Sequence, residues 1–299
     1  MNLNNLLKEA TEQTNKVVAL AAAADEEVIE AVRMAVNQKL ASFILYGDEK
    51  QIMSILEKKD LTHSEDVRVV HSSDDKDSCK SAVTAVRNGE ADVLMKGMVS
   101  TSTILKEVLN KEYGLRKGKS LSHLAAFDVP GYDRMIFVTD SGMNIAPDLQ
   151  QKVDIVNNAV EVATSIGIKT PKVAPLAAVE VINPSMQATL DAAALSQMSV
   201  RGQIKNCVVD GPLALDNAIS AKSASHKGIK SEVAGFADIL LVPSIEVGNA
   251  LYKSLVYFAN AKVGGIIAGA KAPIVLTSRS DDAESKVYSI ALAVSSTNK

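Results

Sequence analysis

The sequence lacks tryptophan, has few other aromatic residues, and has only two cysteines among its 299 residues. With aromatic residues at 4%, few side chains are available to stack on nucleic-acid bases. The formal net charge of -3 provides no cationic excess for a phosphate backbone, so nucleic acid is not an expected partner. Cys79 and Cys207 lie far apart without metal-ligand spacing, which suits a reducing cytoplasm better than a disulfide framework.

Long apolar runs are also missing, and no segment is long and apolar enough to cross a bilayer. The first ten residues are polar and amphipathic and lack the apolar core of a signal peptide. We therefore expect a cytoplasmic protein with no membrane partner. Hydrophobic residues at 47% and charged residues at 22% are ordinary for a globular chain of one large domain or two domains.

Short apolar segments alternate with amphipathic segments along the chain. In the first hundred residues, strands are predicted at 16–21, 42–46, 67–70 and 92–95, and helices at 25–40, 49–58 and 78–88. A charged connection at 110–119 leads to a second series of the same kind, over about 121–268. This alternation predicts the α/β class, with two three-layer α/β/α domains and mainly parallel sheets.

A strand-to-helix junction near the C-terminus carries a hydroxyl and a guanidinium group. Residues 273–277 form an apolar run that predicts a buried strand, and acidic residues from 281 onward precede an apolar helical pattern. Ser278 and Arg279 lie between the two, where open α/β sheets bind ligands and helix N-termini favour anions. The pair therefore suggests a phosphate site with a reacting group. The alternative is a helix cap beside a solvated surface charge.

Other predicted strands also end at glycine and polar groups. Gly97 turns the chain after residues 92–95, Ser100 and Thr101 begin the next helix, and Lys106 lies one to two turns into it. This stretch lacks the spacing of a nucleotide phosphate loop. The further strand-end candidates for substrate binding are Asp140, Asn144, Gly248 and Asn249, whereas Asp210, before Gly211 and Pro212, is interpreted as a plain turn.

Together these strand ends suggest a cleft lined from both domains, although each has a simpler interpretation. Asp140 could cap the segment that follows it, and residues 248–249 could form a helix-entry bend. His123 is interpreted as a core or strand histidine rather than a catalytic one. The sequence shows no catalytic triad, zinc motif or dinucleotide fingerprint, so no metal site is expected.

Several segments, in order, resemble the phosphate acetyl/butyryl transferase family. They are KGMVSTSTILK at 96–106, TDSGMNIAP at 139–147, GIKTPKVA at 167–174, VDGPLALD at 209–216, ADILLVP at 237–243 with GNALYK at 248–253, and TSR at 277–279. Each is weak alone, but the set is specific and covers most of the chain from Asp92 onward. The resemblance implies an isocitrate/isopropylmalate dehydrogenase-like fold with an interdomain cleft. It also implies one domain of residues 1–116 plus 265–299 and another of 117–264.

The chemistry of that family is reversible acyl transfer between coenzyme A and phosphate. The short chain and the Thr-Ser-Arg-Ser context are more similar to its butyryl branch, which implies conversion of butyryl-CoA and phosphate into butyryl phosphate and CoA. The resemblance implies acyl-CoA, phosphate and acyl phosphate as partners, no tightly bound cofactor, and a homo-oligomer. Acetyl transfer is the alternative. A metal-dependent dehydrogenase of the related fold and a non-enzymatic binding module are more distant alternatives.

The resemblance also implies roles for individual residues. Arg279 would bind the phosphate through forked, charge-assisted contacts, and Ser278 would stabilise the oxyanion or orient the thiol. Lys106 falls where the acetyl enzymes have an active-site arginine. Gly97, Ser100 and Thr101 would lie on the phosphate-facing loop.

Two departures from the acetyl enzymes leave the catalytic base unassigned. Ser285 occupies the position where those enzymes carry the aspartate proposed to deprotonate the thiol. A basic insert of those enzymes, with another active-site arginine, is replaced by a short acidic loop at 71–80.

Overall fold

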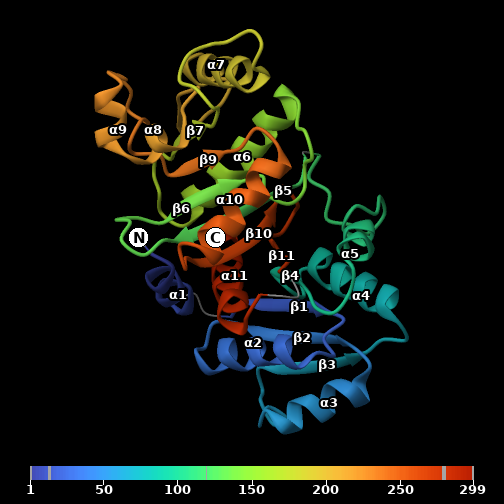
Figure 1. The fold of residues 1–299 in the computed structure, drawn as a ribbon. Helices are drawn as coiled ribbons and strands as arrows, with labels where there is room; N and C mark the ends of the chain where they lie inside the picture. Colours follow the sequence, from blue (N-terminus) through green and yellow to red (C-terminus); the bar gives the residue numbers. More distant parts are fainter. Residues whose placement is uncertain (1, 13–14, 119, 278–280, 298–299) are drawn as a thin grey trace. The chain divides into compact units, whose positions relative to one another are not determined.

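The computed structural model describes residues 2–12, 15–118, 120–277 and 281–297. The chain forms two units, one of residues 1–119 with 263–299 and the other of residues 120–262 (Figure 1). We call them unit 1 and unit 2. Ser278 and Arg279, the pair at the predicted junction, lie outside the described residues.

The sheet of unit 1 is mainly parallel. Its strands run in the order β3-β2-β1-β4-β11-β10. They are β1 Val17–Ala21, β2 Ser42–Gly47, β3 Val67–His71, β4 Val93–Lys96, β10 Lys262–Ala268 and β11 Ile274–Val275. Ala19 pairs with Ile44 on one side and with Leu94 on the other, both in parallel register. The exception is the antiparallel pair of β10 and β11. The strand predicted over 273–277 is thus shorter than expected.

Helices cover the sheet of unit 1. They are α1 Leu3–Thr11, α2 Glu26–Asn37, α3 Glu49–Lys58, α4 Asp75–Arg87, α5 Thr101–Val108 and α11 Ala283–Ser296. Helices α1, α11, α2 and α3 contact one another in series, whereas α4 packs against α5 and the strands β1 and β2. Right-handed crossovers on either side of the central strand place such groups on opposite faces of a parallel sheet. The predicted three-layer arrangement follows from this.

The sheet of unit 2 has the order β5-β6-β9-β7-β8. Its strands are β5 Ser122–Asp128, β6 Ile136–Thr139, β7 Lys172–Pro175, β8 Val208–Val209 and β9 Ile239–Leu241. Its helices are α6 Leu149–Ser165, α7 Gln187–Val200, α8 Leu215–Ile219, α9 Ala221–His226 and α10 Ile245–Tyr257. Within the described residues of unit 2, β5 and β6 pair antiparallel through the turn at residues 130–131, and the pairs β6–β9, β7–β8 and β7–β9 are parallel. The α/β class with mainly parallel sheets is confirmed.

Aspartate side chains determine where several helices begin. The N-cap aspartates accept a backbone N–H of the first turn in α2, α3, α4, α6 and α11, and they are Asp25, Asp48, Asp74, Asp148 and Asp282. Most of these helices follow a strand directly, so the caps place helix N-termini close to the carboxyl ends of the strands. That edge of a parallel sheet is where ligands bind.

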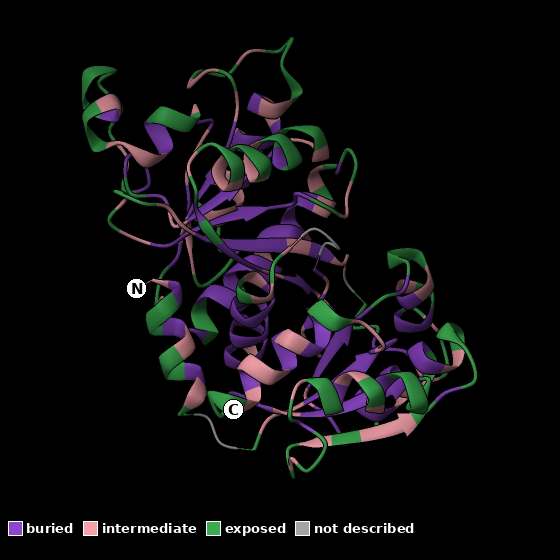
Figure 2. Ribbon diagram, turned by 60° about the horizontal axis from the view of Figure 1, so that its bottom comes forward, coloured by how far each residue is buried: buried purple, intermediate pink, exposed green. Residues whose placement is uncertain are grey.

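The strands carry the core of each unit, as Figure 2 shows by their buried colour. In β1 the run from Val18 to Ala21 is fully buried, as expected for a strand covered on both faces. The edge strand β3 is half-buried by comparison. In the described parts of the chain, no helix is both long enough and apolar enough to cross a membrane.

Candidate active site

A small cavity of about 110 Å3 lies in unit 1 where β1, β4 and β11 end. These strands are neighbours in the sheet, so the turns that follow them meet at one edge. The lining residues are Asp25, Glu27 and Val28 at the start of α2, Lys96, Gly97 and Met98 at the end of β4, Thr277 after β11, and Lys286 in α11. The cavity therefore lies at the place where an α/β sheet binds ligands.

Gly97 makes the turn after β4 possible because two backbones approach closely there. A Cβ atom at this position would lie 2.1 Å from the carbonyl oxygen of Ala22. The amide of Gly97 donates to Ala21 O at 2.8 Å, and the amide of Met98 donates to Ala22 O at 2.9 Å. Any side chain at position 97 would break this junction, which places the next residues beside the cavity.

Two groups hold the loop between β4 and α5. Lys96 is 5% exposed, and its Nζ donates to Gly97 O at 3.0 Å and to Val99 O at 3.1 Å. Ser100 is the N-cap of α5, and its Oγ accepts the amide of Thr103 at 3.1 Å. Ser100 and Thr101 are exposed at the start of the helix, so a ligand can reach their polar groups.

Lys106 lies in the last turn of α5, is exposed, and does not line the cavity. Its neighbour Glu107 is buried and accepts the hydroxyl of Tyr113. That hydrogen bond, with burial and the charge of Glu107, raises the pKa of Tyr113 to about 12. The structure thus brings Gly97, Ser100 and Thr101 together on one loop and places Lys106 farther along the helix.

Residues on both sides of the stretch 278–280 line the cavity, namely Thr277 before it and Lys286 after it. Ser278 and Arg279 follow Thr277 outside the described residues. Ser285 takes part in the N-cap of α11, since its amide donates to Asp282 Oδ1 at 2.8 Å. The adjacent Lys286 is buried and lines the cavity, and its Nζ donates to Asp281 O.

Sequence reasoning missed Lys286 and Lys96 as cavity residues. For Lys286 a signal was available, because it precedes Ile290 by four positions and so falls on the apolar stripe of α11. A lysine on a buried stripe is unusual unless its charge has a partner. Lys96 carried a weaker signal, as the last residue of a buried strand.

In unit 2, Asp140 organises the loop after β6. It is 2% exposed and accepts the amides of Gly142 and Met143, each at 2.9 Å, and of Asn144 at 3.2 Å. The side-chain amide of Asn144 donates to Asp140 Oδ2 at 2.6 Å and to Leu121 O at 2.8 Å. These contacts match the simpler interpretation of Asp140 as a cap for the segment that follows it.

Gly248, in α10, allows that helix to approach the same loop. A Cβ atom on Gly248 would lie 2.5 Å from Asp140 O. Asn249, the next residue, is exposed. His123, on β5, completes the surroundings, with its Nδ1 2.7 Å from Ser141 Oγ. The structure thus groups Asp140, Asn144 and Gly248, with Asn249 at the surface beside them.

Neither cysteine is poised as a nucleophile. Burial, with lesser contributions from nearby charges, raises the pKa of the Cys79 thiol to about 12, and burial raises that of Cys207 to about 11. Thiols with such values carry almost no thiolate near neutral pH. Among the side chains that the structure describes, no three His, Cys, Asp or Glu residues are placed to hold a metal ion.

Glycine turns, capped helices and buried lysines at the carboxyl ends of parallel strands are features with which α/β proteins bind anionic ligands. A sequence profile defines the group more narrowly. The profile described as phosphate acetyl/butaryl transferase matches residues 2–81 and 75–294. The chain belongs to that family.

Similar proteins cover nearly the whole chain. A probable phosphate butyryltransferase of Bacillus subtilis (strain 168) is 55% identical over 98% of this chain and 97% of its own. A phosphate butyryltransferase of Clostridium beijerinckii is 52% identical, covering 98% and 96%. The crystal structure of a branched-chain phosphotransacylase from Enterococcus faecalis V583 has a TM-score of 0.83 and 37% identity, covering 94% of this chain and 99% of that one.

Proposed function

We propose that the chain catalyses reversible acyl transfer between coenzyme A and inorganic phosphate, with butyryl-CoA as the acyl donor and butyryl phosphate as the product. The observation that carries this proposal is the near full-length identity to relatives named phosphate butyryltransferase. We propose that the enzyme works in the cytoplasm, in short-chain fatty acid metabolism. It uses acyl-CoA, phosphate and acyl phosphate as substrates and needs no tightly bound cofactor.

The proposed reaction is a direct displacement in a ternary complex. In the direction of acyl-CoA synthesis, the thiolate of coenzyme A attacks the acyl carbonyl carbon of butyryl phosphate. The C–S bond forms, the C–O bond to phosphate breaks, and phosphate leaves with the electron pair. The high pKa values of both cysteine thiols support a route without a cysteine acyl-enzyme. Trapping of an acyl-enzyme in a single turnover would refute it.

We assign the phosphate to Arg279, because its guanidinium can make forked contacts, and the carbonyl oxygen to Ser278. The loop with Gly97, Ser100 and Thr101 lies beside the cavity and supports a phosphate-facing role. Lys106 adds positive charge along the same helix. The thiol proton goes to a base that we do not place at Ser285.

In unit 2 we keep Asp140, Asn144, Gly248 and Asn249 as substrate-binding candidates with unequal roles. The four hydrogen bonds that Asp140 accepts favour a role in shaping the loop. Asn249 is the exposed member and is best placed to contact a substrate directly.

Phosphate-dependent thiol release from butyryl-, isobutyryl- and acetyl-CoA tests the function. The highest kcat/KM is expected with a four-carbon acyl group, whereas a preference for acetyl-CoA would support the acetyltransferase alternative. No turnover with any of them would favour a binding module, and nicotinamide reduction with a 2-hydroxy acid would favour the dehydrogenase alternative.

An arginine variant tests the phosphate assignment. Arg279→Ala should lower kcat/KM by about 100-fold or more, because a group that holds developing charge is lost. Arg201→Ala, which removes an exposed arginine after α7, is the control and should keep the wild-type rate. An unchanged rate in Arg279→Ala would remove that residue from the site.

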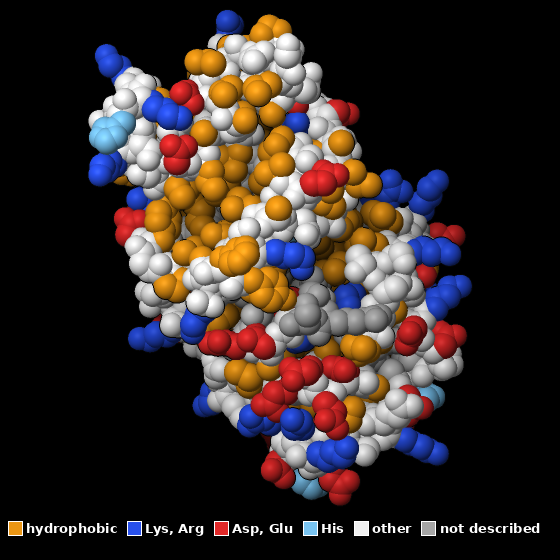
Figure 3. Space-filling view, in the orientation of Figure 1, with side chains coloured by type: hydrophobic (Ala, Val, Ile, Leu, Met, Phe, Trp, Pro, Cys, Tyr) orange, Lys and Arg blue, Asp and Glu red, His pale blue; other side chains and the backbone are white. Residues whose placement is uncertain are grey.

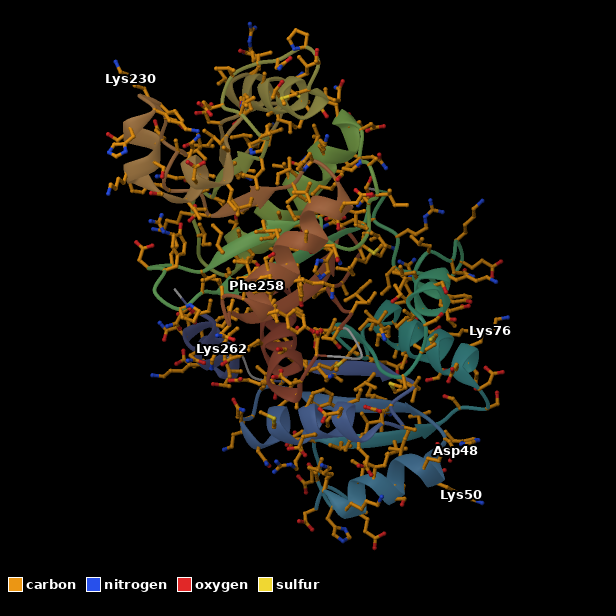
Figure 4. All side chains as sticks on the ribbon, viewed as in Figure 1. Asp48, Lys50, Lys76, Lys230, Phe258 and Lys262 are labelled. Carbon is orange, nitrogen blue, oxygen red and sulfur yellow. The ribbon has the colours of Figure 1, made fainter. Side chains whose placement is uncertain are left out.

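We also propose a homo-oligomer that associates through unit 2. Figure 3 shows hydrophobic side chains gathered over this unit, where an apolar cavity of about 510 Å3 lies. Its walls include Leu176, Met186, Leu215, Pro243, Val247 and Leu251. Phe258, labelled in Figure 4, is 88% exposed after α10. Apolar surface of this kind favours association. Light scattering on wild type and on Val247→Asp should show the oligomer and its dissociation.

A further inference from the structure

Lys286 is a buried cation with few hydrogen bonds. Its residue is 3% exposed, and its ammonium can donate three hydrogen bonds. Within the described parts of the chain, the carbonyl of Asp281 is its one acceptor. A buried charge is costly unless other groups pair with it and accept its hydrogen bonds. Since Lys286 lines the cavity of unit 1, a ligand in the cavity can supply the missing acceptors.

Lys96, at the end of β4, is a second cation that lines the same cavity. It is also buried, and its bonds to the carbonyls of Gly97 and Val99 fix its ammonium beside the turn. Buried charges are screened far less than exposed ones. The two lysines therefore place two buried positive charges on the wall of the cavity.

Two carboxylates, Asp25 and Glu27, line the same cavity. Asp25 caps α2 and accepts the amide of Val28 at 2.9 Å, so the helix dipole offsets part of its charge. Glu27 is exposed, and solvent screens it. No ion pair joins Lys286 to either carboxylate among the described side chains. Its charge is therefore not neutralised from within the cavity.

We propose that this cavity is a phosphate-binding subsite in which the ammonium groups of Lys286 and Lys96 contact the anion. Its volume of about 110 Å3 has room for several water molecules or a small oxyanion. Phosphate oxygens would accept the remaining hydrogen bonds of Lys286. The two lysines would balance the negative charge of the phosphate. This assignment rests on the proposed function and adds Lys286 and Lys96 to the residues proposed to bind the phosphate.

Direct binding of inorganic phosphate, measured by titration calorimetry without acyl-CoA, tests the subsite. Lys286→Met should raise the Kd for phosphate roughly tenfold or more, since a charge-assisted contact is lost. Lys286→Arg, which keeps the charge, should bind more tightly than Lys286→Met. Lys58→Met removes a lysine of α3 that is 63% exposed and should bind phosphate as wild type does.

Thermal unfolding separates this role from a purely structural one. Without phosphate, Lys286→Met should unfold at or above the wild-type temperature, because an incompletely bonded buried charge is gone. The rise in unfolding temperature that phosphate causes in wild type should shrink in the variant. A lower temperature with an unchanged Kd would show that Lys286 only holds the Asp281 carbonyl, and would overturn the proposal.

Two further variants test the subsite if Lys286→Met cannot be used. If Lys286→Met does not fold, Lys286→Arg and Lys96→Met replace it, and a Kd within twofold of wild type in both would overturn the subsite. Phosphate binding by wild type without any acyl turnover would instead contradict the proposed function and leave the subsite standing.

Discussion

Lys152 and Asp191 form a buried ion pair in unit 2 that makes a sharp stability prediction. Lys152 Nζ lies 2.5 Å from Asp191 Oδ2, and the two side chains are only 7% and 9% exposed. Gln187 Nε2 also donates to Asp191 Oδ1 at 2.8 Å. The pair joins α6 to α7, so each charge depends on the other for compensation.

Removing one partner should therefore cost far more than the pair itself is worth. Lys152→Met leaves the carboxylate of Asp191 buried with one neutral donor, and we expect a loss of about 3–5 kcal/mol in the free energy of unfolding. Replacing both residues, by Lys152→Met with Asp191→Leu, should recover most of that loss because no charge is left buried. The expected coupling energy is thus several kcal/mol.

Urea unfolding of the two single variants and the double variant measures these values, and hydrogen exchange of amides in α6 and α7 reports on unit 2 separately. Lys58→Met is the matched control. The ion pair of Lys58 with Glu26 has side chains 63% and 67% exposed, and such pairs contribute about 0–1 kcal/mol. A loss below about 1 kcal/mol in Lys152→Met would refute the reasoning that its charge compensates a buried carboxylate.

Two further predictions concern one backbone contact and one titrating group. Gly248→Ala should cost about 1–3 kcal/mol in urea unfolding and lower kcat/KM, since its Cβ would lie 2.5 Å from Asp140 O; wild-type values in both would contradict this. Hydrogen bonds from Arg33 and Lys59 lower the pKa of Glu30 from 4.5 to about 2. The stability that this carboxylate adds is thus complete above pH 4.5 and disappears as the pH falls towards 2. The difference in stability between wild type and Glu30→Gln should vanish over that range, and a difference independent of pH would exclude this origin.

The sequence predicted β1, β2 and β4 well because these strands are buried on both faces. A continuous apolar run such as 42–46 has few other interpretations between turn residues, and β2 covers Ser42–Gly47. The acidic residues from 281 onward predicted the start of α11 for a similarly local reason, since the Asp282 cap bonds an amide three positions away. The start of α4 was predicted at 78, within an expected loop at 71–80, and this was wrong because Asp74 caps the helix at Asp75. Short-range chemistry determines both features.

The antiparallel pairing of β10 and β11 was not predicted, although its cause is visible in the sequence. Only residues 269–273 separate Ala268 from Ile274, and a parallel connection needs a dozen residues or more. Which strand then lies beside β11 depends on β4, far away in the sequence. Local periodicity carries no information on such a neighbour. Local periodicity also could not show that residues 263–299 belong to unit 1, and only the family resemblance suggested it.

In the candidate site too, features set by local sequence were predicted, whereas features set by the tertiary fold were not. Gly97 and the cap at Ser100 are local features, and the motif containing them was recognised. The burial of Lys96 and Lys286 depends on three strands and two helices meeting at one edge of the sheet. No window of sequence contains that meeting, so neither lysine was predicted to line a cavity.

The register of α11 shows why the base could not be placed by motif alone. Successive residues of a helix point about 100° apart, so positions 285 and 286 face different surroundings. Position 285 gives its amide to the Asp282 cap, whereas position 286 lines the cavity. An ammonium there attracts anions and cannot accept the proton of a thiol while it is charged. The phosphate role proposed for Lys286 therefore leaves the deprotonation of coenzyme A to another group.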